Sequence, residues 1–395
     1  MRTLSKRDLA KYLFYGFIPG KPRSEFQADY SKKLDWSEAK IKKEILRLLK
    51  RAVKKHLQTK NPPAVLLSGG LDSGLVAALM AEFISPKKIH AFSVASQEKE
   101  ADESNYARLA ARHLGIKHHL KTFTAKDGLK LIKKFDRILI KPMADPSLLP
   151  TCFLFDWVKK QGSQSAFLGD GGDEVLAGYP KYLAHWFLEK TGLGKLPLGW
   201  LAGLFPKKQA TFFRYASQPL YLRNQLWISH FSPAAIKELT DEDVDLGDLE
   251  KYHRLFKGAD ILDEAFFLDQ NLTLPGLYLA KTRAASRLSG LRTLCPFLDE
   301  ELFSFCGRVP FELKLKGGQT KALLKEIALD YLPKKIVFRR KRGFGIPLSR
   351  WLTADWQKFV AKELGEAYPQ LIKTGRPEQI WSLLVFKLWS KKFIF

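Results

Sequence analysis

The chain has 395 residues, 46% hydrophobic and 27% charged, which is typical of a globular protein with one large or two medium domains. Three widely spaced cysteines exclude a paired zinc motif and a disulfide framework. No signal peptide or membrane-length apolar run is present, so a cytoplasmic protein without a membrane partner is expected. The formal net charge of +25 fits polyanion binding, nucleic acid included, and equally a solvated basic surface.

The order of predicted elements indicates an α/β protein. Residues 1–36 mix glycine, proline and charge and predict an extension or linker remnant, followed by a main domain over 37–395. An amphipathic helix is predicted at 38–57 because its apolar residues recur at helical spacing. Strands are then expected at 64–67, 88–94, 118–123 and 165–168, with helices at 74–83 and 101–114. This alternation predicts a doubly wound parallel sheet.

The pattern changes at about residue 176. Aromatic residues and leucines then recur at helical spacing, as in Tyr182, Trp186 and Phe187, and strand candidates become few. A mostly helical C-terminal half is therefore expected to pack on the sheet, interrupted by a polar loop near 334–347.

A glycine-rich turn, Ser68–Ser73 (SGGLDS), joins the first strand to its helix. Its glycines let backbone N–H groups approach a ligand, and the helix dipole favours an anion there. Asp72 would repel a bare phosphate but suits a Mg²⁺ ion held between carboxylate and phosphate. The alternative is an ordinary strand–helix turn capped by Asp72. The hexapeptide resembles the loop of N-type ATP pyrophosphatases, which cleave ATP between the α- and β-phosphates, and it lacks the Gly-Lys-Ser/Thr of P-loops.

A second glycine-rich turn, Gly169–Glu174 (GDGGDE), follows the strand at 165–168. Three carboxylates within five residues are costly unless a cation or a substrate amine neutralises them. Loops at the carboxyl ends of parallel strands converge on one crevice, so Asp72 and this cluster are expected to meet around one Mg²⁺-ATP. A helix N-terminus rich in acidic caps is the alternative.

The segment Phe167–Tyr182 (FLGDGGDEVLAGYPKY) resembles the signature of the synthetase domain of asparagine synthetases. Further similar motifs follow the family order from about residue 37 to the C-terminus. They are Asp102-Glu103 to His118-His119, Ala144–Ser147, Cys295–Asp299, Lys314–Lys321, Lys341–Pro347 and Ile380–Leu384.

The resemblance implies a site for ATP and Mg²⁺. The implied nucleotide-binding residues are Leu67, Ser68, Gly69, Gly70, Asp72, Ser73, Ser93, Val94, Gly169 and Lys321. Asp72 and Asp173 would be the Mg²⁺ ligands, and Asp170 occupies the family's catalytic acidic position. Lys341 matches a lysine that balances negative charge on the leaving pyrophosphate or the intermediate.

Two departures from the family affect the substrates. Relatives that use glutamine carry an N-terminal glutaminase domain with cysteine as residue 2, whereas this chain has Arg2 and only residues 1–36 ahead of the synthetase part. Nitrogen is therefore expected from ammonia, from an amine on another substrate or from a separate glutaminase. Before Pro296, two family acids and an arginine are replaced, which leaves the carboxylate substrate open. The replacing residues are Arg283, Arg292 and Leu294.

The expected function is that of an amide-forming ligase. It would adenylate a small carboxylate, with aspartate as one possibility, and release AMP and pyrophosphate. The alternative enzyme is a PP-loop RNA-modifying ATPase, which the basic charge favours and the motifs over 296–347 oppose. A non-catalytic scaffold is the third hypothesis, but it would not need Asp72, Asp170, Asp173 and Lys341 together.

Overall fold

The structure, a computed structural model, describes residues 5–20, 28–57, 64–98, 102–258, 260–339, 345–365 and 367–393. Five parallel strands form one sheet in the order β3-β2-β1-β4-β5. They are β1 (Ala64–Leu66), β2 (His90–Ser96), β3 (Lys117–Phe123), β4 (Ser165–Phe167) and β5 (Arg292–Leu294). The strand order reverses between β1 and β4, and open parallel sheets bind ligands at the carboxyl side of such a switch point.

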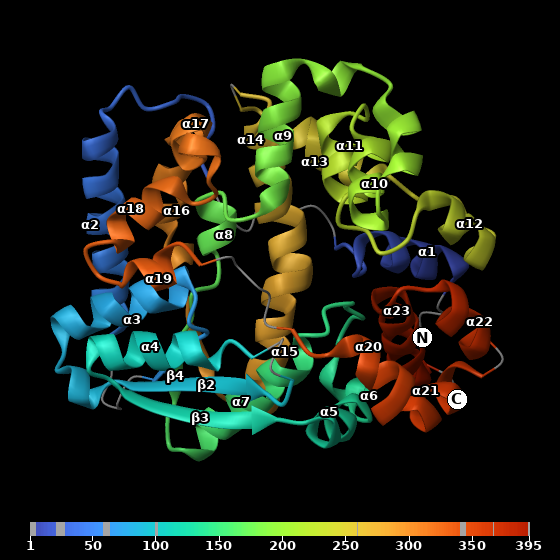
Figure 1. The fold of residues 1–395 in the computed structure, drawn as a ribbon, viewed down its shortest axis with the longest axis horizontal. Helices are drawn as coiled ribbons and strands as arrows, with labels where there is room; N and C mark the ends of the chain where they lie inside the picture. The colour runs from blue at the N-terminus through green and yellow to red at the C-terminus, as the bar shows by residue number, and fades with distance from the viewer. Residues whose placement is uncertain are drawn as a thin grey trace.

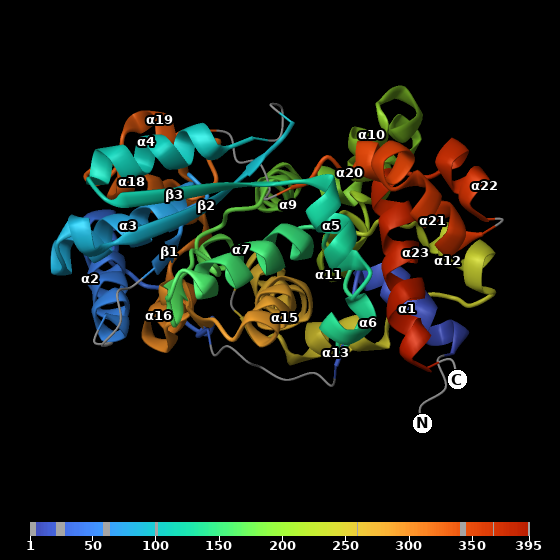
Figure 2. The ribbon, with the colours of Figure 1, turned by 90° about the horizontal axis from the view of Figure 1, so that it is seen from below.

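Helices cover both faces of the sheet (Figures 1 and 2). Those of the N-terminal half are α2 (Glu38–His56), α3 (Leu71–Phe83), η1 (Pro86–Lys88), α4 (Ser104–Leu114), α5 (Ala125–Ile132), α6 (Phe135–Ile138) and α7 (Leu148–Lys160). Figure 2 shows α4 on one side of the strands and α7 on the other. Successive residues of a strand point to opposite faces, so Val65 joins the core with α2, α3 and α4, whereas Leu66 joins the core with α7. Strand β1 is therefore packed on both faces and lies at the centre of the sheet.

The chain after β4 is mostly helical. Its first elements are α8 (Gly172–Val175), α9 (Pro180–Thr191), η2 (Leu193–Lys195), η3 (Leu198–Leu204), α10 (Lys207–Tyr215), α11 (Leu220–Leu226), α12 (Pro233–Thr240), α13 (Gly247–Leu255), α14 (Asp263–Leu268), the π-helical η4 (Asp269–Tyr278) and α15 (Leu279–Ser289). After β5 come η5 (Pro296–Leu298), α16 (Glu300–Arg308), α17 (Phe311–Lys314), η6 (Lys316–Gly318), α18 (Ala322–Ala328), α19 (Lys334–Val337), α20 (Leu348–Arg350), η7 (Trp351–Asp355), α21 (Gln357–Leu364), α22 (Ala367–Thr374), α23 (Pro377–Ser390) and η8 (Lys391–Phe393).

Helix α1 (Lys6–Tyr15) lies within the segment for which the sequence predicts only an extension. Ser5 and Asp8 form a capping box at its N-terminus. Tyr12 and Phe14 are fully buried, and the Tyr12 hydroxyl donates to the carbonyl of Ser382 on α23 at 2.9 Å. Figure 1 shows α1 between α12 and α23. The helix therefore belongs to the packed structure, and the domain division at residue 36 stays a prediction.

The predicted fold class is confirmed. The four expected strands correspond to β1–β4, and the helix expected at 38–57 is α2. The fifth strand, β5, is not predicted from the sequence, because its residues Arg-Thr-Leu are not an apolar run ending in a glycine-rich turn, as those of β1 and β4 are. None of the helices in the described ranges combines the length and the apolar character needed to cross a bilayer.

Candidate active site

The turn Ser68–Ser73 lies between β1 and α3, at the carboxyl edge of the sheet. The Ser68 and Ser73 hydroxyl oxygens are 3.0 Å apart, and the Ser68 N–H donates to Ser73 Oγ at 3.2 Å. Gly70 is the N-cap residue of α3 and has no side chain to accept from the first helical turn. Backbone donors and the positive end of the dipole of a 13-residue helix therefore face the turn, which suits an anion.

Gly69 brings this turn against helix α4. Its φ of +70° lies in the left-handed region that favours glycine. A Cβ at this position would lie 2.4 Å from the backbone nitrogen of Ala107 and 2.8 Å from the Cβ of Tyr106. Because these atoms belong to a packed helix, no larger residue fits at position 69.

An arginine that the sequence does not single out borders the same turn. Arg339 Nη2 lies 2.9 Å from Glu103 Oε1, and the guanidinium carbon lies 4.8 Å from the centre of the Tyr106 ring. Only 7% of the Arg339 side chain is exposed, and a Cβ on Gly70 would lie 3.9 Å from its Nη2. The carboxylate and the ring hold a cation beside the phosphate-type turn. In the sequence, Arg339 is one of several basic residues in a row, and nothing there distinguishes it.

The predicted catalytic Lys341 lies outside the described residues.

Ser93, which the resemblance assigns to the nucleotide, lies on β2 and links it to the chain after β1 and to the edge strand β3. Its hydroxyl donates to the carbonyl of Leu67 and lies 2.8 Å from Nε2 of His118 on β3. Burial lowers the pKa of His118, which favours its neutral form. The Leu67 N–H donates to the carbonyl of Phe92 at 2.9 Å, and Val94 follows on the same strand. Leu67, Ser93 and Val94 thus lie together at the carboxyl half of β1 and β2.

The two glycine-rich turns are in direct contact. A Cβ on Gly169 would lie 2.8 Å from both the Cβ of Asp72 and the backbone nitrogen of Ser73. A Cβ on Gly172 would lie 2.6 Å from Asp72 Oδ1. The Asp72 side chain therefore fits against two glycines of the second turn, and a side chain at either position would displace it.

Lys321 joins the carboxylates of the two turns. Its ammonium lies 2.6 Å from each oxygen of Asp72 and 2.7 Å from Asp173 Oδ1. Burial lowers the pKa of Lys321, but Asp173 and Asp72 outweigh it and hold the pKa above its usual range. The carboxylates from two separate strand ends therefore converge on one cation, in a place where only 7% of the Lys321 side chain is exposed.

The backbone that carries Lys321 is strained. Lys321 and Ala177 both have positive φ, of 56° and 61°, and the Lys321 N–H donates to the Ala177 carbonyl at 3.1 Å. Left-handed geometry costs a non-glycine residue roughly 1–2 kcal/mol. Both residues adopt this left-handed geometry where the chain after α8 meets the start of α18. The Lys321 ammonium is thereby directed towards Asp72 and Asp173.

Asp170 points away from this pair, towards helix α15. Its Oδ2 accepts a hydrogen bond from the Thr282 hydroxyl at 2.8 Å. Burial raises the pKa of Asp170, and the Lys281 charge and the Thr282 hydrogen bond only partly offset it. A carboxyl with a raised pKa at the end of a parallel strand is a candidate for proton exchange.

Lys281 binds the turn Ala144–Ser147, and its charge also acts on Asp170. Its ammonium lies 3.0 Å from Asp145 Oδ2 and donates to Ser147 Oγ at 2.8 Å. Burial would raise the pKa of Asp145, but Lys281 and hydrogen bonds from Ser147 lower it overall. The side chains of Lys281 and Asp145 are only 17% and 14% exposed. Lys281 is not among the residues predicted from the sequence, because an isolated lysine in a helix carries no motif.

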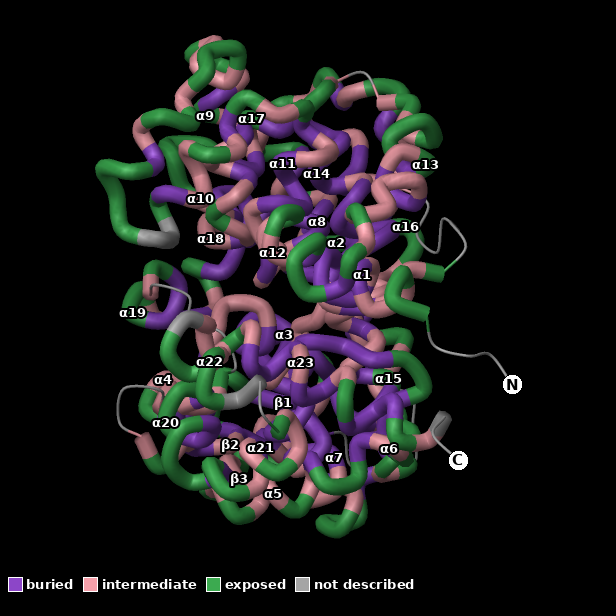
Figure 3. The backbone as a smooth tube through the Cα atoms, turned by 90° about the vertical axis from the view of Figure 1, so that its right-hand side faces the viewer, coloured by how far each residue is buried: buried purple, intermediate pink, exposed green. Residues whose placement is uncertain are grey.

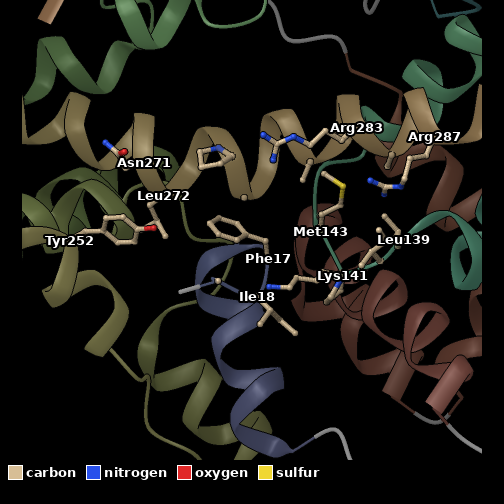
Figure 4. Close-up of a pocket in the computed structure, with 17 residues that line it drawn as sticks. Phe17, Ile18, Leu139, Lys141, Met143, Tyr252, Asn271, Leu272, Arg283 and Arg287 are labelled. Carbon is tan, nitrogen blue, oxygen red and sulfur yellow. The ribbon is translucent and has the colours of Figure 1, made fainter. Parts of the chain in front are cut away.

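The three residues that depart from the family pattern lie elsewhere. Arg283 lines a cavity of about 480 Å³ together with Arg287, on a face of α15 different from the one that carries Thr282 (Figure 4). Arg292 is exposed at the amino end of β5, and Leu294 is buried in that strand. The Arg283 and Arg292 side chains therefore lie away from the Asp170 cluster. Leu294 lies nearer to it, because its carbonyl accepts a hydrogen bond at 2.9 Å from the N–H of Leu168, two residues before Asp170.

The fold and these turns define a class of protein: a parallel α/β protein with an anion-binding turn and a carboxylate cluster at the switch point of its sheet. Its family follows from the match of residues 44–390 to the family described as asparagine synthase, which covers most of the chain. The chain belongs to the asparagine synthase family.

Several relatives match most of the chain. The chain is 26% identical to "Asparagine synthetase [glutamine-hydrolyzing] 1" of Bacillus subtilis, over 93% of this chain and 62% of that protein. It is 30% identical to "Putative asparagine synthetase [glutamine-hydrolyzing] 2" of Methanocaldococcus jannaschii, over 72% and 54%. It is 28% identical to "Asparagine synthetase B [glutamine-hydrolyzing]" of Escherichia coli, over 95% and 56%. The chain thus spans less than two thirds of the length of these relatives.

Proposed function

We propose that this protein is an ATP-dependent amide-forming ligase that adenylates a small carboxylate and releases pyrophosphate and AMP. The observation that carries the proposal is the convergence of Asp72 and Asp173 on Lys321, beside the uncapped N-terminus of α3. Family membership supports the same chemistry, with aspartate as the first acid to test.

ATP would bind with its phosphates at Ser68–Ser73. The N–H groups at the start of α3 and the serine hydroxyls would hold phosphate oxygens, and Ser93 and Val94 on β2 would flank the adenine. The substrate carboxylate oxygen attacks the α-phosphorus, and the bond from that phosphorus to the bridging oxygen breaks. Arg339 lies where it would stabilise the charge that develops on the departing pyrophosphate.

The donor set at Asp72 and Asp173 fits Mg²⁺. Both groups are carboxylates, which this ion prefers, and both already face a single cation, the Lys321 ammonium. Within the described ranges, no three His, Cys, Asp or Glu side chains gather as a metal site, so ATP oxygens and water would complete the coordination. Bound Mg²⁺ would neutralise phosphate charge.

Asp170 would serve the second half of the reaction. A nitrogen nucleophile attacks the acyl carbon, the bond to the AMP oxygen breaks, and the nitrogen gives up a proton. Asp170 would accept this proton, because its raised pKa makes the carboxylate a stronger base than an exposed aspartate. The nitrogen would come from ammonia, from a substrate amine or from a separate glutaminase.

The experiment that tests the proposal is product analysis. The full chain, ATP, Mg²⁺ and ammonia are incubated with a panel of small carboxylates, and AMP and ADP are separated. We expect AMP and pyrophosphate that depend on one of the acids and are lost in Asp72→Ala. Asp156→Ala, which removes a half-exposed carboxylate on α7, is the matched control and should keep full activity. ADP and phosphate as products would refute the proposed chemistry.

An RNA-modifying ATPase is the second candidate, because of the net charge of +25. Non-specific RNA binding weakens steeply with salt. Complex formation with bulk tRNA that survives about 0.2 M salt, together with AMP release that depends on tRNA, would favour this function over the ligase.

A further inference from the structure

Four large apolar side chains are exposed within ten residues between α9 and α10. They are Leu196 (50%), Trp200 (74%), Leu204 (71%) and Phe205 (42%). Figure 1 draws this part of the chain, between the labels α9 and α10, at the edge of the molecule away from the strands, and Figure 3 shows it largely exposed. Single exposed apolar residues are common, but a cluster of this kind marks a contact surface.

The cluster rests on a packed base. Ala202 of η3 is buried, and the ring of Phe205 stacks on Phe213 of α10 with 4.5 Å between the ring centres. Phe212 in turn stacks on Trp227, with 5.4 Å between the ring centres. The exposed side chains are therefore presented by an ordered element.

The stretch of sequence that contains the cluster carries basic residues and no acidic ones. From residue 190 to residue 237 the sequence has seven lysines and arginines and no aspartate or glutamate. Lys195 and Arg214 are exposed next to the apolar cluster along the chain. Three of these cations pair with carboxylates from outside the segment: Lys190 with Glu312, Arg223 with Glu189, and Lys237 with Asp243. Exposed tryptophan, leucine and phenylalanine side chains with exposed cations such as Lys195 and Arg214 nearby have the composition of segments that lie in the headgroup region of anionic membranes.

We propose that the segment 195–206 is a membrane-contact surface that binds anionic phospholipid bilayers. Trp200 and Leu204 enter the boundary between headgroups and acyl chains, and the neighbouring cations face the lipid phosphates. Nucleic acid fits less well, because Leu196 and Leu204 have no aromatic face on which a base could stack. A surface contact needs no spanning helix, and it is independent of the ligase chemistry.

Vesicle sedimentation tests the proposal. The full chain is mixed with vesicles of phosphatidylcholine alone or with about 30% phosphatidylglycerol, at low salt and at about 0.5 M salt. We expect binding to the anionic vesicles that weakens with salt. Trp200→Ser/Leu204→Ser should lower it about tenfold or more, because it removes most of the buried apolar area. Neither residue is part of the candidate active site, so AMP formation should stay unchanged.

Ile261→Ser is the matched control, since this residue is 54% exposed on another part of the surface. It should sediment as the original chain does, and circular dichroism checks that every variant is folded. Failure to bind either vesicle would overturn the proposal, as would equal binding by the double variant. A dimer that the double variant loses, without vesicle binding, would instead assign the surface to a second copy of the chain.

Discussion

Replacing Lys281 by methionine removes a cation that pairs with Asp145 and acts electrostatically on Asp170, while keeping a similar volume. The Lys281 ammonium lies 3.0 Å from Asp145 Oδ2, and both side chains are less than one-fifth exposed. Breaking a buried ion pair by removing one partner costs about 3–5 kcal/mol of stability. Because both side chains keep some exposure, we expect the free energy of unfolding to fall by about 3 kcal/mol. Denaturant unfolding at neutral pH measures this loss.

The loss should depend on pH in a defined direction. Lys281 contributes to the lowered pKa of Asp145. The pair therefore stabilises the fold fully above the pKa of aspartate in the unfolded chain, which is about 4, and this stabilisation is lost as the pH falls through the lower pKa of the folded state. The difference in unfolding free energy between the original chain and Lys281→Met should therefore shrink below about pH 4. In the active site, the pKa of Asp170 should rise further, so the acid limb of the pH–activity profile should move to higher pH.

Two further variants separate charge from structure. Lys281→Arg keeps the cation and should keep the pH profile near its original position. Lys281→Met/Asp145→Asn removes both charges and should regain most of the lost stability, because no buried charge is left unpaired. Its profile should remain shifted, since Asp170 still lacks the cation. An unchanged pH profile in Lys281→Met would refute the positioning role of Lys281.

Three other outcomes follow from the site and the core. Lys321→Met leaves the Asp72 and Asp173 carboxylates repelling each other, so its Tm without Mg²⁺ should be lower than that of the original chain. Millimolar Mg²⁺ should then raise the Tm of the variant more than that of the original chain. Gly69→Ala should lose nucleotide binding in calorimetry and at least about 1–2 kcal/mol of stability, because φ is +70° and its Cβ would clash with α4. Burial lowers the pKa of Lys314 to about 8, so the charged form of this side chain opposes folding below that pH. In urea titrations, Lys314→Met should therefore be more stable than the original chain at pH 7, and this gain in stability should fall as the pH rises above about 8.

The phosphate end of the site could be predicted from the sequence because its chemistry is local. The turn Ser68–Ser73 carries its glycines, hydroxyls and helix start within six residues, and Gly169–Glu174 does the same for the second turn. The parallel sheet then brings the two together by a general rule of topology.

Other residues of the candidate site could not be predicted, because they are distant single residues that the fold brings together. Lys281 reaches Asp145 across 136 positions of sequence, and Thr282 reaches Asp170 across 112. Arg339 lies beside the turn because α19 ends there, while its basic neighbours in the sequence have the same composition. Which contacts form depends on the face of the helix from which a side chain projects. Arg283 lines the cavity of Figure 4, whereas its neighbour on α15, Thr282, contacts Asp170.

The distribution of charge favours one of the two proposed enzymes over the other. The chain as a whole is strongly basic, yet among the described residues of the site the carboxylates of Asp72, Asp145, Asp170 and Asp173 outnumber the ammonium groups of Lys281 and Lys321. Arg339 is balanced by Glu103. A site with this excess of negative charge favours Mg²⁺ and a substrate that carries an ammonium group, and it disfavours a bare polyanion. An amino acid brings both the carboxylate to be adenylated and the ammonium that the acidic end can bind, so the local field supports an amino-acid ligase over an RNA-modifying enzyme despite the net charge.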